Sequence, residues 1–175
     1  KAIVLVLPRF DIWVRQSVRL LLLTGQRLDA ILGLRWDQLD WDARVVDFEF
    51  GLTQAHRRKR RAIQPLTPEF EAACLLGEKS GPYVIHRPSS ICRVWQPLFR
   101  AEWKKVCKAA GVPYITPHGL RHTVGTNLIQ QGVGMSEVSY YLGHSSILTT
   151  EKHYAHRSPE HMKKSVEAVG RLVGR

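Results

Sequence analysis

Two glycines divide the C-terminal part of the sequence into short segments with helical periodicity. In residues 118–131 the apolar side chains recur at every fourth position: Leu120, Val124 and Leu128. This spacing places them on one face of a helix, and Gly132 is expected to end that helix. A shorter helix is predicted over residues 137–142, with Gly143 as its end. This part of the chain is therefore predicted to be helical.

The rest of the chain is predicted to be mainly helical, with one small sheet. Further helices are expected over residues 11–23, 27–34, 67–76, 89–110 and 159–173. Residues 44–50, RVVDFEF, alternate and are rich in β-branched and aromatic side chains, which is typical of a strand. Residues 61–66, RAIQPL, are the expected return strand, and Pro65 indicates that this strand lies at an edge or ends there. The predicted fold class is α+β, mainly α-helical with a small antiparallel β-sheet, in a single domain over residues 1–175.

The charge of the chain indicates a polyanionic partner. Lysine and arginine together number 26 against 15 aspartate and glutamate residues, which gives a net charge of +11. A surplus of that size on a small domain favours binding to nucleic acid or to an anionic membrane surface, although a merely soluble basic protein would also carry it. No apolar run approaches the length of a membrane span.

Cysteine usage and the N-terminal stretch bear on the compartment. The three cysteines, Cys74, Cys92 and Cys107, form neither a disulfide framework nor a CxxC metal clip, which favours a reducing cytoplasm. The opening stretch, KAIVLVLPRF, lacks the small-residue cleavage site of a signal peptide. Because the sequence does not begin with Met, we expect it to be a fragment of a longer protein.

The stretch TPHGLRHT, residues 116–123, holds three cationic or imidazole side chains within one helical turn. His118 and His122 share a helix face at the i, i+4 spacing by which two imidazoles hold zinc, but no third ligand is evident and Arg121 would repel a cation. A buried histidine with satisfied hydrogen bonds is the simpler interpretation, above all for His122. The third interpretation is a phosphate held by His118 and Arg121 near a helix N-terminus, where backbone N–H groups and the helix dipole favour an anion.

Three other stretches are weak signals when each is taken alone. Arg27 follows a Thr-Gly helix break in TGQR, yet an arginine in a first helical turn is usually solvated. His144 follows a glycine C-cap in LGH, which is a common arrangement. Tyr154 in HYAH is by itself more typical of a half-buried packing residue.

Taken together, these residues resemble the catalytic signature of the tyrosine recombinases, the phage integrase family. The similarity is carried by residues 21–40, LLLTGQRLDAILGLRWDQLD, and by residues 116–160, which begin TPHGLRHTVGTNLIQQGVG and continue through LGHSS to HYAHRSPE. It extends from about Leu20 to the end of the chain. As a set, in this order and spacing, the motifs are specific, although each one alone is not. The resemblance implies the tyrosine recombinase catalytic-domain fold, without the N-terminal DNA-clamping domain that the family usually has.

The resemblance also implies a chemistry and a role for each residue. Tyr154 would attack a DNA phosphodiester and form a transient 3′-phosphotyrosine link, which conserves the bond energy for rejoining. Arg27 and Arg121 would bind the two non-bridging oxygens, and His144 would donate a hydrogen bond to one of them. His118 would accept the proton of the tyrosine, whose ordinary pKa of ~10 requires a nearby base at neutral pH. No metal or other cofactor is implied, because cationic side chains supply the charge stabilisation.

The segment between the two predicted strands would supply the remaining catalytic group. The family uses a lysine in a β-hairpin turn as the general acid for the departing 5′ oxygen, and Lys59 is the only lysine in QAHRRKRRAIQPL. Counting back from the PL that closes the strand places the position nearer Arg57, but arginine is a poor proton donor. The cationic run could be a solvated face or a nuclear import signal. We favour a hairpin that contacts DNA phosphates through its four arginines, Arg57, Arg58, Arg60 and Arg61.

A second departure from the family pattern lies just after TGQR. The family usually has an acid three residues beyond its arginine, where this chain has Ala30. Asp29, one residue earlier, is expected to take over the supporting role.

The sequence therefore predicts a site-specific DNA recombinase or integrase of a bacterium, phage or mobile element, acting on the chromosome in the cytoplasm. The expected partners are double-stranded DNA and other copies of the chain, in a tetrameric synapse held through the C-terminal helix at residues 159–173. The alternative, that this helix packs on its own domain, stays open. Three alternatives remain open. They are a type IB topoisomerase that relaxes supercoils as a monomer, a DNA-binding module that has lost the reaction, and a zinc protein built on His118 and His122.

Overall fold

The structure of the chain is a computed structural model that describes residues 1–51, 62–88, 90–144, 146, 148 and 150. Within these residues the α-helices are α1 (Ala2–Val6), α2 (Ile12–Thr24), α3 (Leu28–Leu32), α4 (Pro68–Cys74), α5 (Gln96–Ala109), α6 (Pro117–Gln130) and α7 (Met135–Leu142). The strands are β1 (Leu39–Asp40), β2 (Val45–Asp47) and β3 (Ile63–Pro65), and two short 3-10 helices are η1 (Leu7–Arg9) and η2 (Trp36–Gln38).

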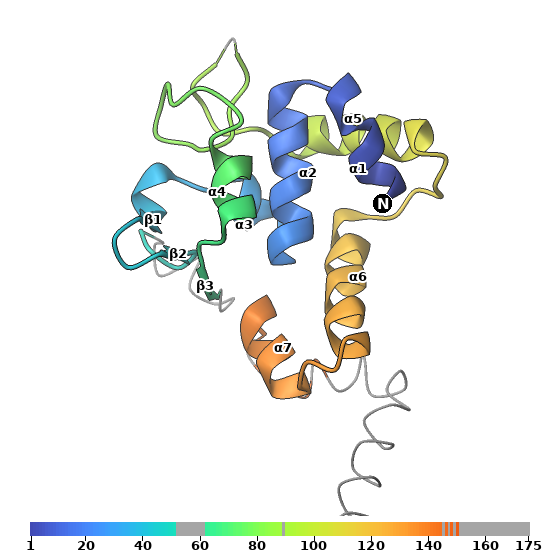
Figure 1. Cartoon of the computed structure of the whole chain (residues 1–175). Helices are drawn as coiled ribbons and strands as arrows, with labels where there is room; N and C mark the ends of the chain where they lie inside the picture. Colours follow the sequence, from blue (N-terminus) through green and yellow to red (C-terminus); the bar gives the residue numbers. More distant parts are fainter. Residues whose placement is uncertain (52–61, 89, 145, 147, 149, 151–175) are drawn as a thin grey trace, which may run out of the picture.

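Helix α2 lies at the centre of the molecule and packs against α3, α4, α5 and α6 (Figure 1). Five of its apolar side chains are buried on the faces that meet these neighbours, where they recur with helical periodicity: Trp13, Val14, Val18, Leu20 and Leu21. The helix ends where Gly25 adopts a left-handed backbone with φ 59° and donates its N–H to the carbonyl of Leu21. Glycine suits this position because it has no Cβ to oppose a positive φ.

The sheet is antiparallel, in the order β1-β2-β3, and lies to one side of α2 and α3 (Figure 1). In its register Val46 pairs with Gln64, and both side chains are buried on the same face. The predicted pairing of the two strands is confirmed, and Pro65 ends the edge strand β3 as expected from its missing N–H. Strand β1 was not predicted, because two residues in a turn-rich stretch are too few to show the alternation of apolar and polar side chains.

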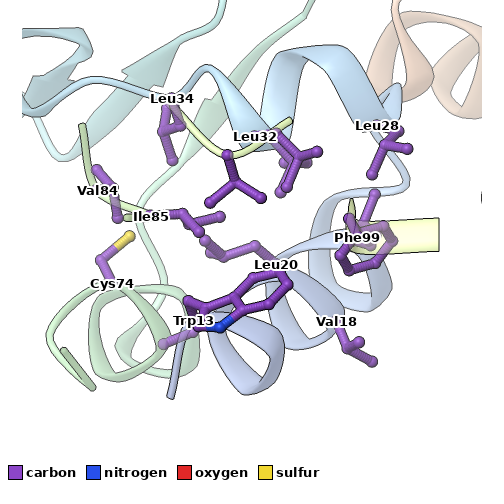
Figure 2. Close-up of a cluster of buried hydrophobic side chains, with 14 of the residues drawn as sticks. Trp13, Val18, Leu20, Leu28, Leu32, Leu34, Cys74, Val84, Ile85 and Phe99 are labelled. Atoms are coloured by element: carbon purple, nitrogen blue, oxygen red, sulfur yellow. The ribbon is translucent and has the colours of Figure 1, made fainter. Parts of the chain in front are cut away.

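Two hydrophobic clusters of different size form the interior. The large one joins α2, α3, α4 and α5, and Figure 2 shows Leu20, Leu32, Cys74 and Phe99 converging within it. The small one lies between α6 and α7 and contains Ile129, Val138 and Leu142 as its buried members. Helix α7 is thus attached to the rest of the protein through a minor cluster of its own.

Several helix boundaries differ from the prediction. Helix α5 begins at Gln96 instead of near residue 89, because Pro97 lacks an N–H and therefore fits the first turn instead of bending a longer helix. Outside the three strands, Tyr83 makes an isolated antiparallel bridge with Arg35. The helix predicted at residues 159–173 lies outside the described residues. None of the described helices is both long and apolar enough to span a bilayer.

Candidate active site

The first candidate residue, Arg27, lies at the turn between α2 and α3. It is the N-cap of α3, with an extended backbone, and its carbonyl accepts hydrogen bonds from Ala30 N at 2.9 Å and Ile31 N at 3.2 Å. Its side chain is half-buried. The backbone of this turn is fixed by the helix that it starts, so the position of Arg27 depends on how the turn packs against its neighbours.

The turn packs directly against α6 and α7 through Gly25. A Cβ at this position would lie 2.6 Å from Leu142 Cδ2 on α7 and 3.1 Å from Val124 Cγ1 on α6. Real Cβ atoms do not approach a neighbour at 2.6 Å, so a side chain at position 25 would require Leu142 to shift. The contact brings the end of α7 against the Arg27 turn.

Arg121 projects from the second turn of α6 and is almost fully buried, at 3% exposure. Its Nη1 donates to the carbonyl oxygen of Gly25 at 2.9 Å. The acceptor is neutral, so this bond fixes the guanidinium group without neutralising its charge. The two predicted arginines are therefore brought to one place: Arg121 is bonded to the residue two positions before Arg27.

Helix α6 begins at a well-defined cap. Thr116 is the N-cap, and its hydroxyl accepts a hydrogen bond from Gly119 N at 3.0 Å, with Pro117 in the first turn. His118 is thereby placed in the exposed first turn, one helical turn before His122. The helix begins where the TPHGLRHT motif predicted.

The two histidines of α6 form a pair. Their Nε2 atoms lie 3.0 Å apart, and the rings meet edge-to-face with centroids 4.5 Å apart. A hydrogen bond at this distance requires that one Nε2 carries a proton and the other does not. His122 is half-buried and pairs with His118, so its hydrogen bond is made to the candidate residue itself, a contact that the sequence did not predict. Among the described residues, no three histidine, cysteine or acidic side chains are grouped so as to hold a metal ion.

His144 follows directly after α7. Gly143 ends that helix with φ 67°, its N–H donating to Tyr140 O, while His144 N donates to Ser139 O, both at 2.9 Å. These bonds fix the backbone of His144 at the helix end. The imidazole Nδ1 lies 2.8 Å from the hydroxyl of Thr150, which is fully buried and orients the ring. Thr150 was not predicted as a site residue, because a single threonine near a histidine forms no sequence motif.

Asp29, expected to support Arg27 in the absence of an acid at position 30, is engaged with the segment before α5. Its carboxylate accepts hydrogen bonds from Arg93 and, at 3.1 Å, from Gln96 Nε2. Arg93 also donates to the Asp29 carbonyl at 2.9 Å. Ala30 is buried in the large cluster. Asp29 thus ties the Arg27 turn to α5, and the support of Arg27 by Asp29 stays a prediction.

A comparison with protein families shows to which family the chain belongs. A sequence profile described as the phage integrase family matches residues 2–161. The chain belongs to the phage integrase family.

This integrase-family chain is 27% identical over 182 residues to the tyrosine recombinase XerA of Pyrococcus furiosus, an alignment that covers 98% of the chain and 60% of XerA. It is 30% identical over 153 residues to XerC of Mycobacterium tuberculosis, covering 78% of the chain and 47% of XerC. The chain therefore spans less than two thirds of either relative.

Solved structures of the same family confirm the fold. The integrase-family chain resembles the crystal structure of XerA recombinase with a TM-score of 0.69 and 21% identity, over 87% of the chain and 55% of that structure. It resembles the Tn1549 transposon integrase in complex with circular intermediate DNA with a TM-score of 0.72 and 20% identity, over 88% and 59%. The predicted fold, mainly helical with a small antiparallel sheet, is thus the fold of tyrosine recombinases.

The remaining predicted residues of this family member lie outside the described residues. They are Tyr154, the proposed general acid Lys59, and the four arginines Arg57, Arg58, Arg60 and Arg61. In the sequence, Lys59 falls between the described strands β2 and β3. The roles assigned to these residues stay predictions.

Proposed function

We propose that this chain is the catalytic part of a site-specific DNA recombinase or integrase, which cleaves and rejoins DNA strands through a transient 3′-phosphotyrosine link at Tyr154. The observation that carries the proposal is the hydrogen bond between buried Arg121 and Gly25, because it brings the side chain of Arg121 to the turn that carries Arg27. Membership of the phage integrase family supports the same activity.

The two arginines act on the phosphate. When the tyrosine oxygen attacks phosphorus, negative charge grows on the two non-bridging oxygens of a five-coordinate transition state. Arg27 and Arg121 donate to these oxygens, and a fork of fixed N–H donors suits them geometrically. Because Arg121 is buried at 3% exposure, water screens its charge weakly and the stabilisation is correspondingly strong.

The imidazoles and the hairpin lysine complete the reaction. His118 accepts the proton of Tyr154 as the phenol attacks, and its pairing with His122 holds the ring in the α6 first turn. His144, oriented by Thr150, donates to a non-bridging oxygen. Lys59 gives its proton to the departing 5′ oxygen, and the reverse sequence rejoins the strand.

The partner is double-stranded DNA, bound by a chain with a net charge of +11. Arg57, Arg58, Arg60 and Arg61 contact its phosphates. The related Tn1549 integrase is solved in complex with circular intermediate DNA, and a lambda integrase dimer with a COC′ core site, which supports a DNA partner here. We further propose that copies of the chain assemble on DNA as a tetrameric synapse through residues 159–173, and that they act on a chromosome in the cytoplasm.

A covalent trap tests the proposal. The probe is a pool of DNA duplexes that carry one nick with randomised sequence on either side of it. Cleavage next to the nick releases a short fragment that diffuses away, so that the protein stays attached as an adduct that survives denaturant. The wild-type chain is expected to form this adduct, and the Tyr154→Phe variant to form none.

Other outcomes of this experiment contradict specific parts of the proposal. DNA binding without an adduct would identify a binding module. An adduct with Tyr154→Phe would assign the nucleophile to another residue. In a separate assay, relaxation of a supercoiled plasmid by the monomer, without strand exchange, would indicate a topoisomerase. Duplexes recovered from the wild-type adduct then serve as a defined substrate.

A further inference from the structure

We propose that two buried glutamines, Gln64 and Gln26, are positioning residues for the candidate active site. They hold the end of α7, and with it His144, against the turn that carries Arg27. The inference rests on the proposed function, because it assigns Gln64 and Gln26 an effect on the rate of DNA cleavage.

The two hydrophobic clusters explain why hydrogen bonds are needed to position the end of α7. His144 follows α7, whose apolar side chains belong to the small cluster shared with α6. Arg27 follows α2, whose apolar side chains belong to the large cluster. Apolar packing is non-directional, whereas a hydrogen bond fixes the relative position of the two groups that it joins. Directional bonds between the end of α2 and the end of α7 therefore act together with the packing of Leu142 on the Gly25 turn to set the distance between Arg27 and His144.

Both glutamines bond the same backbone atom. Gln64 Nε2 donates to the carbonyl oxygen of Tyr141 at 2.7 Å, and Gln26 Nε2 donates to that oxygen at 3.0 Å. A carbonyl oxygen only accepts and has two lone pairs, so two amide N–H groups satisfy it fully. Tyr141 lies in the last turn of α7, where carbonyl groups have no partner within the helix.

Gln64 also reaches the end of α2. The same Nε2 donates to the carbonyl oxygen of Thr24 at 3.0 Å, and the hydroxyl of Tyr141 donates to the carbonyl oxygen of Leu23. Thr24 lies three residues before Arg27, and Tyr141 lies three residues before His144. One amide group therefore bridges the two backbone segments that lead into the two candidate residues.

The third element in this junction is the hairpin. Gln64 lies in β3, where its backbone is paired with Val46 of β2, five residues after Lys59 in the sequence. The side chain thus links the strand that follows the proposed general acid to both other segments. Its exposure is 3% and that of Gln26 is 1%, so neither bond competes with water.

The test replaces each glutamine by methionine, which has similar volume but no donor. Gln16→Met is the matched control: Gln16 is 2% exposed and also donates to two carbonyl groups, but these belong to Cys74 and Val84, on the α4 side of α2. Single-turnover adduct formation is measured at saturating concentrations of the DNA selected with the wild-type chain. DNA affinity and thermal unfolding are measured on the same variants.

We expect Gln64→Met to form the adduct at least ~10-fold more slowly than wild type at saturating DNA, because displacement of a reacting group by about 1 Å costs up to ~10²-fold. DNA affinity is expected to stay close to the wild-type value. Gln16→Met is expected to lose comparable thermal stability and to keep the wild-type rate. If Gln64→Met does not fold, Gln26→Met carries the test, since it removes one of the two bonds to Tyr141 O and should slow the adduct in the same way.

Two results would overturn the inference. One is a wild-type rate in folded Gln64→Met and Gln26→Met. The other is equal slowing in Gln16→Met, which would reduce the effect to general loss of stability. Absence of an adduct from the wild-type chain would instead contradict the proposed function. In the variant that carries both Gln64→Met and Gln26→Met, the two reductions in the rate of adduct formation should be less than additive in free energy. Both glutamines act through one carbonyl group.

Discussion

The guanidinium group of Arg121 donates from Nη1 to the carbonyl oxygen of Gly25, 2.9 Å away and 96 residues earlier in the chain. This bond joins the second turn of α6 to the turn that begins α3. It gives a buried cation a fixed orientation next to Arg27. The relationship supports the proposal that these two arginines, far apart in sequence, act on one phosphate.

Replacement of Arg121 by lysine is expected to slow adduct formation by ~10²-fold or more, since lysine keeps the charge but loses the planar fork of donors. The rate is measured in single turnover at saturating DNA. Arg35→Lys is the control, because Arg35 forms an exposed ion pair with Asp37 at 2.7 Å and should keep the wild-type rate. A fully active Arg121→Lys variant would remove Arg121 from the catalytic role.

Replacement of Gly25 by alanine is expected to lower the free energy of unfolding by about 2–5 kcal/mol. About 1–2 kcal/mol of this comes from the left-handed backbone, and the rest from the overlap of the new Cβ with Leu142. Gly111→Ala separates the two causes: Gly111 has φ 66° with no atom within 4 Å of the added Cβ, so it should lose only the backbone part. Urea unfolding measures both, and equal losses would contradict the close packing of α7 on the turn.

Replacement of Thr150 by valine is expected to lower the free energy of unfolding by about 1 kcal/mol, because it removes the hydrogen bond to His144 Nδ1 at an almost unchanged volume. Adduct formation should slow as well, since the imidazole loses its orientation. Thr123→Val removes a similar hydroxyl bond, to Gly119 O on the exposed side of α6, and should leave the rate unchanged. A normal rate in Thr150→Val would show that the ring is oriented by other contacts.

The stability of the protein is expected to fall as the pH rises above about 9, in part through Cys74. Burial in the large cluster, and secondarily the nearby Glu71, raises the pKa of this thiol to about 12. Between the unfolded pKa and pH 12 the unfolded thiol loses its proton while the folded one keeps it. The unfolded state then binds fewer protons, and the free energy of unfolding falls by up to ~1.4 kcal/mol per pH unit for this group.

The Cys74→Ala variant tests this pH dependence. It lacks the thiol, so its free energy of unfolding should decline less steeply between pH 9 and 11 than that of the wild type. The comparison is made by urea unfolding at each pH. Identical slopes in the two proteins would contradict a raised pKa for Cys74.

The local elements of the fold were predictable because their signals act over a few residues. Thr67 and Pro68 start α4 as expected, and the hydroxyl of Thr67 accepts from Phe70 N at 3.2 Å. Gly143 ends α7 in the left-handed region, as its place after an apolar segment predicted. The boundary of α5 was not predictable in the same way, because Pro97 is compatible both with a first turn and with a bend.

The candidate site was predictable only as a set of residue types. The order of Arg27, His118, Arg121 and His144 indicated a phosphate site through its resemblance to a family. Nothing local indicated that His122 would pair with His118, or that Thr150 would orient His144. Each of those contacts depends on which polar atom lies opposite after the helices have packed.

The sequence by itself indicated where most of the described helices lie, that Gly143 ends α7 and that two strands pair antiparallel, because backbone preference and apolar periodicity are properties of neighbouring residues. Only the tertiary structure decided that Arg121 would meet Gly25 across 96 residues and that Gln64 would meet Tyr141 across 77. The physical reason is that a buried donor bonds to whichever carbonyl group packing leaves unsatisfied, and that choice is made between elements and not within them.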